Sequence, residues 1–318
     1  LAHFGSGRGG RRAWQSAGSG GIPALLGCCC LNLLYAGPGL LLLQLFSMDN
    51  DSERSLSDRS PLVNPEEFPD WILFEDEDLL VVDKPGWLVC HPSKNGPWSS
   101  LVGAAKTYSG IEKLYLAGRL DRETSGVILF GKNAVSGKSW QKALEAREAK
   151  RSYLSILEGE LMAAMDLETH LGKDPKSPVF VKQRVTEPSR KSKPAKTSFS
   201  PLKISSGFTL AMVRTGSGRK HQIRAHAQWA GFPIVGDKLY GRDENLYLDF
   251  CRAGWSEEMA ERLALPRQAL HAFLFGKEED FFFAPFPSDL EKFCLDEMKI
   301  RRADLSHALG LARDLACD

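Results

Sequence analysis

The chain has 318 residues, of which 43% are hydrophobic and 25% are charged, and its formal net charge at pH 7 is +1. These proportions are ordinary for globular proteins, so they argue against a disordered chain and against a multi-spanning membrane protein. Because the net charge is small, any attraction to nucleic-acid phosphates must come from local basic clusters. The seven cysteines include no C-x-x-C pair, which gives no sign of a zinc site or a disulfide framework and fits a reducing cytoplasm.

The N-terminal part of the chain differs in composition from the rest. Residues 22–46 contain no charged residue and follow three arginines, as in a signal peptide or a membrane anchor, but a Gly-Pro-Gly sequence interrupts the apolar run. We therefore interpret residues 1–47 as a disordered leader or as translated upstream sequence, with Met48 as a candidate start, and we expect no membrane contact. Residues 48–70 are polar and acidic and contain three prolines, which predicts a linker or an extended arm.

From residue 71 onward the pattern changes to short apolar runs rich in branched and aromatic residues. Residues 71–74 and 79–82 flank an acidic turn, which predicts a β-hairpin. Further predicted strands cover residues 127–130, 153–157, 208–213 and 270–275. Predicted helices cover residues 135–150, 222–230, 257–265 and 288–298. Strands and helices are therefore intermixed along the chain.

Residues 182–196 form a strongly basic segment. They include six basic residues against one acidic residue, together with Pro188 and Pro194. This composition predicts a mobile basic loop.

The densest group of polar residues is the sequence G-R-L-D-R-E-T-S-G at residues 118–126, directly before an apolar run. Loops fixed to a rigid strand often display catalytic groups, so Asp121 is a candidate catalytic residue. Ser125 and Gly126 are small and allow another backbone to approach closely. Judged on this segment alone, the commoner explanation is that Asp121 is an ordinary loop residue paired with a neighbouring arginine.

A second polar group is the sequence G-R-K-H-Q-I-R-A-H at residues 218–226, where a predicted helix begins. His221, Arg224 and Gln228 fall on one stripe of this helix, and the opposite face is apolar. The stripe either faces a cleft or is a solvated helix face. No third ligand is suitably spaced around the histidines, so we predict no metal.

Together these segments resemble the RluA-type pseudouridine synthases. The resemblance rests on five blocks in the family's order, which are residues 81–92, 118–126, 150–153, 218–226, and the closing segment at 267–271 and 284–287. The sequences H-Q-I-R and I-V-G-D-K-L-Y-G favour the RluA branch. One departure is Gly118, because the family usually has histidine there, and glycine is closer to the small-subunit ribosomal RNA branch. Gly118 therefore leaves the identity of the RNA substrate open, more than it affects the expected type of reaction.

The resemblance implies an α+β pseudouridine synthase fold with a central mixed, mainly antiparallel sheet flanked by helices and loops. We expect this catalytic domain over residues 71–292 and a C-terminal helical tail over residues 293–318. The implied reaction is the isomerisation of uridine to pseudouridine in ribosomal or transfer RNA, through base flipping and without a cofactor. RNA is the expected partner, and we expect a cytoplasmic monomer.

The resemblance also implies roles for individual residues. Asp121 is the essential carboxylate, which must be ionised, and Arg224 is its implied cationic partner. Tyr153 is the implied active-site tyrosine, which covers the uracil and assists proton removal at C5, whereas a buried strand tyrosine is the plainer explanation. The residues expected to contact RNA are Arg119, Arg122, Arg219, Lys220, His221, Lys191 and Lys193.

Two other functions stay open at this point. The first is an RNA-binding module without catalysis, which would keep the basic segments and tolerate loss of the carboxylate. The second is a hydrolase that pairs Asp121 with Asp83 or Asp237 as acid and base. Release of tritium from C5-labelled uridine in RNA separates the three, because only the synthase breaks the C5–H bond.

Overall fold

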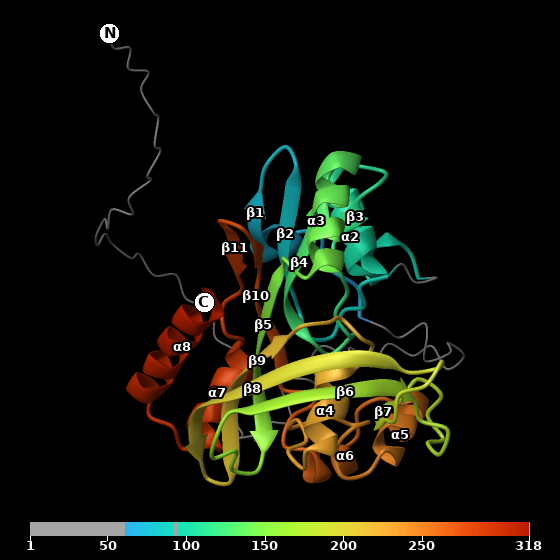
Figure 1. The fold of residues 1–318 in the computed structure, drawn as a ribbon. Coiled ribbons are helices and arrows are strands. Elements are labelled where there is room, and N and C mark those ends of the chain that lie inside the picture. Colours follow the sequence, from blue (N-terminus) through green and yellow to red (C-terminus); the bar gives the residue numbers. More distant parts are fainter. Residues whose placement is uncertain (1–60, 92–94, 318) are drawn as a thin grey trace, which may run out of the picture.

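The computed structural model describes residues 61–91 and 95–317, so the predictions for residues 1–47 and for most of residues 48–70 lie outside the described part. Within it, the strands form an 11-stranded sheet in the order β1-β2-β4-β10-β5-β9-β8-β6-β7, with β3 paired to β4 and β11 to β10 (Figure 1). The strands are β1 (Ile72–Glu75), β2 (Leu79–Lys84), β3 (Tyr115–Leu116), β4 (Ser125–Gly131), β5 (Lys150–Glu158), β6 (Met165–Lys173), β7 (Gln183–Thr186), β8 (Lys193–Ser205), β9 (Phe208–Thr215), β10 (Leu270–Lys277) and β11 (Asp280–Phe283). The α-helices are α2 (Leu101–Ser109), α3 (Ala134–Ala146), α4 (Gln222–Trp229), α5 (Asn245–Ala253), α6 (Glu257–Arg262), α7 (Ser288–Asp296) and α8 (Arg302–Cys317).

The sheet is mixed and mainly antiparallel, which confirms the expected α+β architecture. Only β4 and β10 pair in parallel among the described strands. At this junction Gly126 lies opposite Ala272 with a φ of 110°. A Cβ atom at Gly126 would lie 2.2 Å from the carbonyl oxygen of Ala272. The close backbone approach predicted for this position is therefore present, and it joins the strand after the Asp121 loop to β10.

The predicted hairpin is formed by β1 and β2, which pair in antiparallel fashion. Its acidic turn is stabilised by Asp76, whose Oδ1 accepts hydrogen bonds from the backbone N–H groups of Asp78 and Leu79 at 2.8 and 2.7 Å. The four other predicted strands are also present. The helix predicted over residues 257–265 is too long, because α6 ends at Arg262 and Leu263 is extended. The helix predicted over residues 135–150 is also too long, because α3 ends at Ala146 and Arg147 follows in the left-handed conformation with a φ of 63°. This turn sends the chain directly into β5.

The prediction of a mobile loop over residues 182–196 is wrong. β7 and the first residues of β8 both pair with β6, which leaves a turn over residues 187–192. Pro194 is tolerated in β8 because the strand pairs there with β6 alone, and pairing with β9 begins at Thr197. Lys182 is buried, and its Nζ donates to Glu244 at 3.0 Å. The charges and prolines of this segment predict a loop, whereas pairing with β6 stabilises two strands there.

The elements form two halves that share the sheet (Figure 1). The upper half in this view contains β1, β2, β4, α2 and α3, and the lower half contains β6 to β9 with α4, α5 and α6. Each half has its own apolar core, and Phe293 of α7 and Leu305 of α8 are buried in the lower one. Val63 and Phe68 are buried in the upper core. Among the described residues, no helix has the length and apolar character that crossing a membrane requires.

Candidate active site

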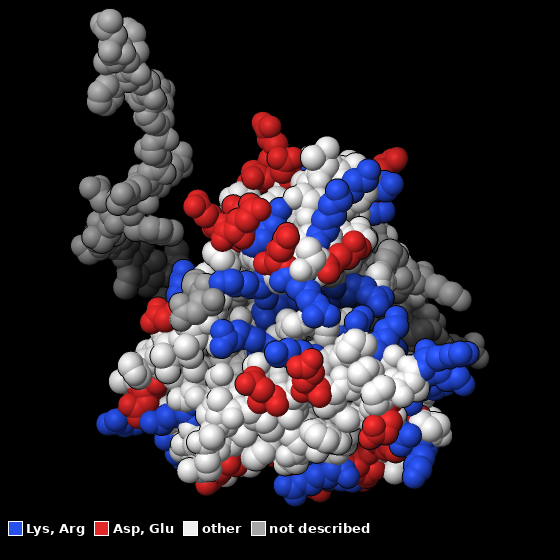
Figure 2. Space-filling view, viewed as in Figure 1, with Lys and Arg blue, Asp and Glu red and all other residues white. Residues whose placement is uncertain are grey.

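A pocket of about 750 Å³ lies where the two halves meet. Its walls come from the loop before β4, from the start of β5, from the end of β9 and from the start of α4. Figure 2 shows lysine and arginine side chains gathered in a furrow between the upper and lower halves. The pocket therefore joins segments that are distant in sequence, and it does so in a basic surface.

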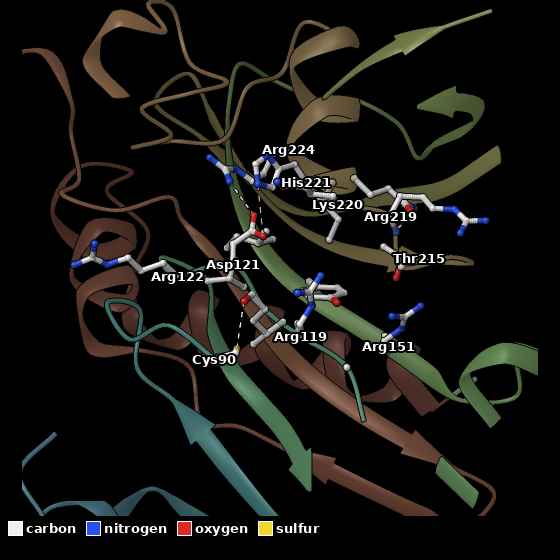
Figure 3. A pocket seen from close by; sticks show the side chains of 18 of the residues that line it. Cys90, Arg119, Asp121, Arg122, Arg151, Thr215, Arg219, Lys220, His221 and Arg224 are labelled. Carbon is white, nitrogen blue, oxygen red and sulfur yellow. Dashed lines mark hydrogen bonds and ion pairs between the residues drawn. The ribbon is translucent and has the colours of Figure 1, made fainter. Parts of the chain in front are cut away.

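Asp121 and Arg224 meet in this pocket (Figure 3). Nη1 of Arg224 donates to Oδ2 of Asp121 at 2.8 Å, across 103 positions of sequence. The side chain of Asp121 is 30% exposed, whereas that of Arg224 is 8% exposed. Burial raises the pKa of Asp121, but the charge and the hydrogen bond of Arg224 outweigh it and hold the pKa below its ordinary value. Asp121 is thus ionised at neutral pH and open to the pocket.

Arg224 owes its position to Asp237, which sequence reasoning considered only as part of a hydrolase pair. Nε and Nη2 of Arg224 donate to the two carboxylate oxygens of Asp237 at 2.7 and 2.9 Å. The same carboxylate accepts backbone hydrogen bonds from Leu239 and Tyr240 at 3.0 and 2.9 Å, and its side chain has no exposed surface. Such a bidentate pair fixes the guanidinium plane and leaves Nη1 directed at Asp121. The sequence I-V-G-D-K-L-Y-G carried the signal for this partner.

These contacts also remove the basis for a hydrolase pair. The carboxylate of Asp237 is fully engaged and shielded from the pocket. Asp83 does not line the pocket. Among the described residues, no second carboxylate lines the pocket wall to share acid and base roles with Asp121.

His221 precedes α4 and adopts the left-handed conformation, with a φ of 53°. Its Nδ1 lies 3.0 Å from the hydroxyl oxygen of Tyr240, and its Nε2 lies 3.9 Å from Oδ1 of Asp121. Burial lowers the pKa of His221 to about 4, although the charge of Asp121 opposes the shift. His221 is therefore neutral at pH 7, where it presents a polar ring to Asp121 rather than a positive charge to a phosphate.

Buried basic side chains hold the loop that carries Asp121. Nζ of Lys84, a residue with no exposed surface, donates to the carbonyl oxygen of Arg122 at 2.9 Å. Burial lowers the pKa of Lys84 to about 7. Lys238 donates to the Glu123 carboxylate at 2.7 Å, and Arg267 donates to the Glu123 carbonyl oxygen at 3.3 Å. These supports were not predicted, because sequence order does not show which distant cation reaches which carbonyl group.

Tyr153 lies on β5 and lines the same pocket, partly buried. Burial raises its pKa, Arg151 lowers it and Asp121 raises it, with a net increase. Its phenol is therefore protonated at neutral pH. The ring can cover a bound base, and the hydroxyl group can donate or relay a proton rather than act as a permanent phenolate.

The structure brings together most of the basic residues expected to contact RNA. Arg119, Arg122, Arg219 and Lys220 line the pocket. Lys191 lies in the β7–β8 turn and Lys193 begins β8, and both are exposed but outside the pocket wall. Arg151 also lines the pocket and was not among the expected RNA contacts. In the described part of the chain, no cluster of metal-binding side chains is present.

Comparison with known proteins decides the family. The sequence pattern of the family described as RNA pseudouridylate synthase matches residues 78–229. A ribosomal large subunit pseudouridine synthase D of Xanthomonas campestris is 31% identical over 259 residues, which cover 78% of this chain and 74% of that protein. The chain belongs to the RNA pseudouridine synthase family. Relatives of this name place it with the RluA-type members, as the sequence predicted.

One further relative and two solved structures match different shares of this chain. An uncharacterized RNA pseudouridine synthase of Mycoplasma pneumoniae is 37% identical over 186 residues, but the match spans only 58% of that protein and 56% of this chain. The solved structure of human RNA pseudouridylate synthase domain containing 4 aligns with a TM-score of 0.58 at 20% identity, over 74% of this chain and 96% of that one. Human RNA pseudouridylate synthase domain containing 1 gives a TM-score of 0.53, also at 20% identity, over 81% of this chain and 97% of that one. The two human structures confirm the predicted fold.

Proposed function

We propose that this chain isomerises uridine to pseudouridine in ribosomal or transfer RNA, with Asp121 as the essential carboxylate. One observation carries the proposal: an ionised, partly exposed carboxylate held by Arg224 in a pocket whose remaining charged lining residues are cationic. The pocket volume of about 750 Å³ lies within the range of sites that enclose a small ligand. It therefore has room for one nucleotide removed from its stack.

The reaction breaks the bond between N1 of uracil and C1′ of ribose, turns the base, and forms a bond between C5 and C1′. The proton at C5 is lost and N1 gains one, so no atom is added and no cofactor is consumed. Asp121 acts as nucleophile or as base, and both roles need its ionised form. Arg224 keeps that form stable in a partly dry site. Tyr153 covers the uracil, and its hydroxyl group relays the C5 proton.

We infer base flipping, and the position of Asp121 within the pocket supports it. A uridine stacked in RNA hides its glycosidic bond, and extrusion costs a few kcal/mol. Contacts between RNA phosphates and the basic rim offset this cost. We assign these contacts to Arg119, Arg122, Arg219 and Lys220 at the pocket, and to Lys191 and Lys193 at the turn that leads from β7 into β8. His221, being neutral, supports Asp121 and contacts the nucleotide through hydrogen bonds.

We assign the cytoplasm as the site of action and a monomer as the active form. Cys90 and Cys294 are both buried and unpaired, as expected in a reducing compartment. The RNA target is left as ribosomal or transfer RNA, since structured RNA is selected by shape and by unstacked loops. Gly118 lines the pocket with a φ of 133°, a conformation that favours glycine over the histidine usual at this position.

The test uses transcripts of large-subunit ribosomal RNA and of transfer RNA that carry tritium at C5 of uridine. The wild-type chain should release tritium into water from at least one of these RNAs. Asp121→Asn should release none, while its affinity for the same RNA stays within about threefold, because the amide keeps the shape of the side chain. Binding without release by the wild-type chain would support the RNA-binding module instead. Liberation of free uracil would support a hydrolase.

A further inference from the structure

Two polar side chains at one end of the pocket have no partner. β5 and β9 pair in antiparallel register with Ser152 opposite Arg214, so Arg151 and Thr215 are the next facing positions. Nε of Arg151 and Oγ1 of Thr215 are both buried, and neither makes a hydrogen bond within the described structure. Buried polar groups without partners are rare and cost stability. This pair therefore indicates a place where a ligand supplies the missing contacts.

Gly218 leaves room for the guanidinium of Arg151. A Cβ atom at Gly218 would lie 2.7 Å from Nη1 of Arg151, so the guanidinium would have to shift. The backbone around it is fixed by Gln222, whose Oε1 accepts hydrogen bonds from the Ser217 hydroxyl at 2.7 Å and from the Arg219 backbone N–H at 3.1 Å. The space beside Arg151 is thus held open by a braced turn rather than by chance packing.

The same end of the pocket is rich in uncompensated positive charge. In Figure 3, Arg151, Thr215 and Arg219 gather on one side, and Asp121 with Arg224 lies on the other. Neither Arg151 nor Arg219 forms an ion pair with a carboxylate of the described residues. A planar guanidinium next to a hydroxyl group matches the oxygens of a phosphate.

We propose that Arg151 and Thr215 form an anion subsite that binds one backbone phosphate of the RNA, next to the nucleotide whose base enters at Asp121. The inference rests on the proposed function and adds a contact to it. Arg151 donates its free N–H groups to phosphate oxygens, Thr215 donates its hydroxyl proton, and Gly218 keeps the guanidinium in place. The subsite fixes where the sugar-phosphate chain runs while the base turns.

The test measures RNA affinity against salt concentration for the full chain and for Arg151→Met. Loss of one phosphate contact lowers the slope of log affinity against log salt by about 0.7–0.9. We expect this decrease together with a roughly tenfold rise in KM, the loss of about one charged hydrogen bond, and a kcat within about threefold of wild type. Lys142→Met is the matched control, since Lys142 is exposed on α3 outside the pocket and should change neither quantity.

Two further variants keep the test decisive if Arg151→Met folds poorly. Gly218→Ala retains every charge but makes the guanidinium shift, so it should raise KM by less than Arg151→Met does. Thr215→Val should raise KM, and Thr215→Ser should restore it. Unchanged KM and salt slope in Arg151→Met, or unchanged KM in Thr215→Val where that variant stands in for it, would overturn the subsite. The wild-type chain could release no tritium while Arg151→Met still shows a lower slope of log affinity against log salt. That result would refute the proposed reaction and leave the subsite standing.

Discussion

Replacement of Arg224 by methionine tests how the site and the fold depend on one guanidinium. Methionine keeps much of the side-chain length but removes the charge, so two carboxylates lose their cation. Loss of the cation costs more stability at Asp237 than at Asp121, because the Asp237 side chain has no exposed surface and loses two hydrogen bonds of 2.7 and 2.9 Å. Breaking a buried ion pair from one side typically costs about 3–5 kcal/mol. We expect the free energy of unfolding to fall by about 4 kcal/mol.

The same variant should also change the acid–base behaviour of Asp121. Burial raises the pKa of this carboxyl group, and Arg224 is the main group that opposes it. Without Arg224 the pKa of Asp121 should therefore lie above its ordinary value. As the pH is lowered, any residual tritium release should then decline at a higher pH than in the wild type, because Asp121 becomes protonated sooner. Urea unfolding and a pH profile of tritium release measure the two effects separately.

The matched control is Arg242→Met. Arg242 is 88% exposed, and its Nε lies 3.2 Å from Glu158, so this surface pair should contribute little. If Arg224→Met unfolded at the same urea concentration as the wild type and Arg242→Met, the buried network would not support the fold as described. If its residual activity kept the wild-type pH profile, Arg224 would not control the ionisation of Asp121.

Three further outcomes follow from individual residues. Gly126→Ala should destabilise the fold by about 4 kcal/mol or more, because its Cβ atom would lie 2.2 Å from a carbonyl oxygen of β10. Gly110→Ala is the control, since the space around Gly110 is open, and it should cost about 1–2 kcal/mol. Thermal unfolding measures both, and equal costs would contradict the packing. Burial lowers the pKa of His226 to about 4 and of His271 to about 3, whereas both values are near 6.5 in the unfolded chain, which therefore binds more protons. The free energy of unfolding should fall as the pH drops from 6.5 towards 4, by up to about 1.4 kcal/mol per pH unit for each histidine. His226→Gln should reduce this dependence on pH, as measured by urea titrations. Tyr153→Phe should slow tritium release by about 10²–10⁴-fold with unchanged RNA affinity, and a wild-type rate would exclude the hydroxyl group from proton transfer.

Local pattern predicted the elements that depend on local chemistry. The hairpin at residues 72–84 was predictable because an acidic turn separates two apolar runs, and its turn residue Asp76 bonds its own neighbours. Strands β7 and β8 were not, because each is stabilised by pairing with β6, which lies between them, and their charges and prolines predict a loop. The end of α3 was also missed, since a left-handed arginine at position 147 has no clear sequence signal.

The site shows the same division between local and tertiary information. The pairing of Asp121 with Arg224 came from the family resemblance, since no spacing rule predicts a contact across 103 positions. The neutral state of His221 depends on burial, which exists only after folding. The role of Asp237 was hidden for a related reason. Its carboxylate is structural because Arg224 reaches it from α4, and a sequence cannot show that reach.

A single-turnover experiment tests the central claim most directly. Excess wild-type chain and excess Asp121→Asn are each incubated with the responsive RNA, which is then digested to nucleosides and separated by chromatography. The wild type should convert uridine to pseudouridine in one kinetic phase, and Asp121→Asn should form none although it binds the RNA. Formation of pseudouridine by Asp121→Asn at a rate near that of the wild type would contradict the account.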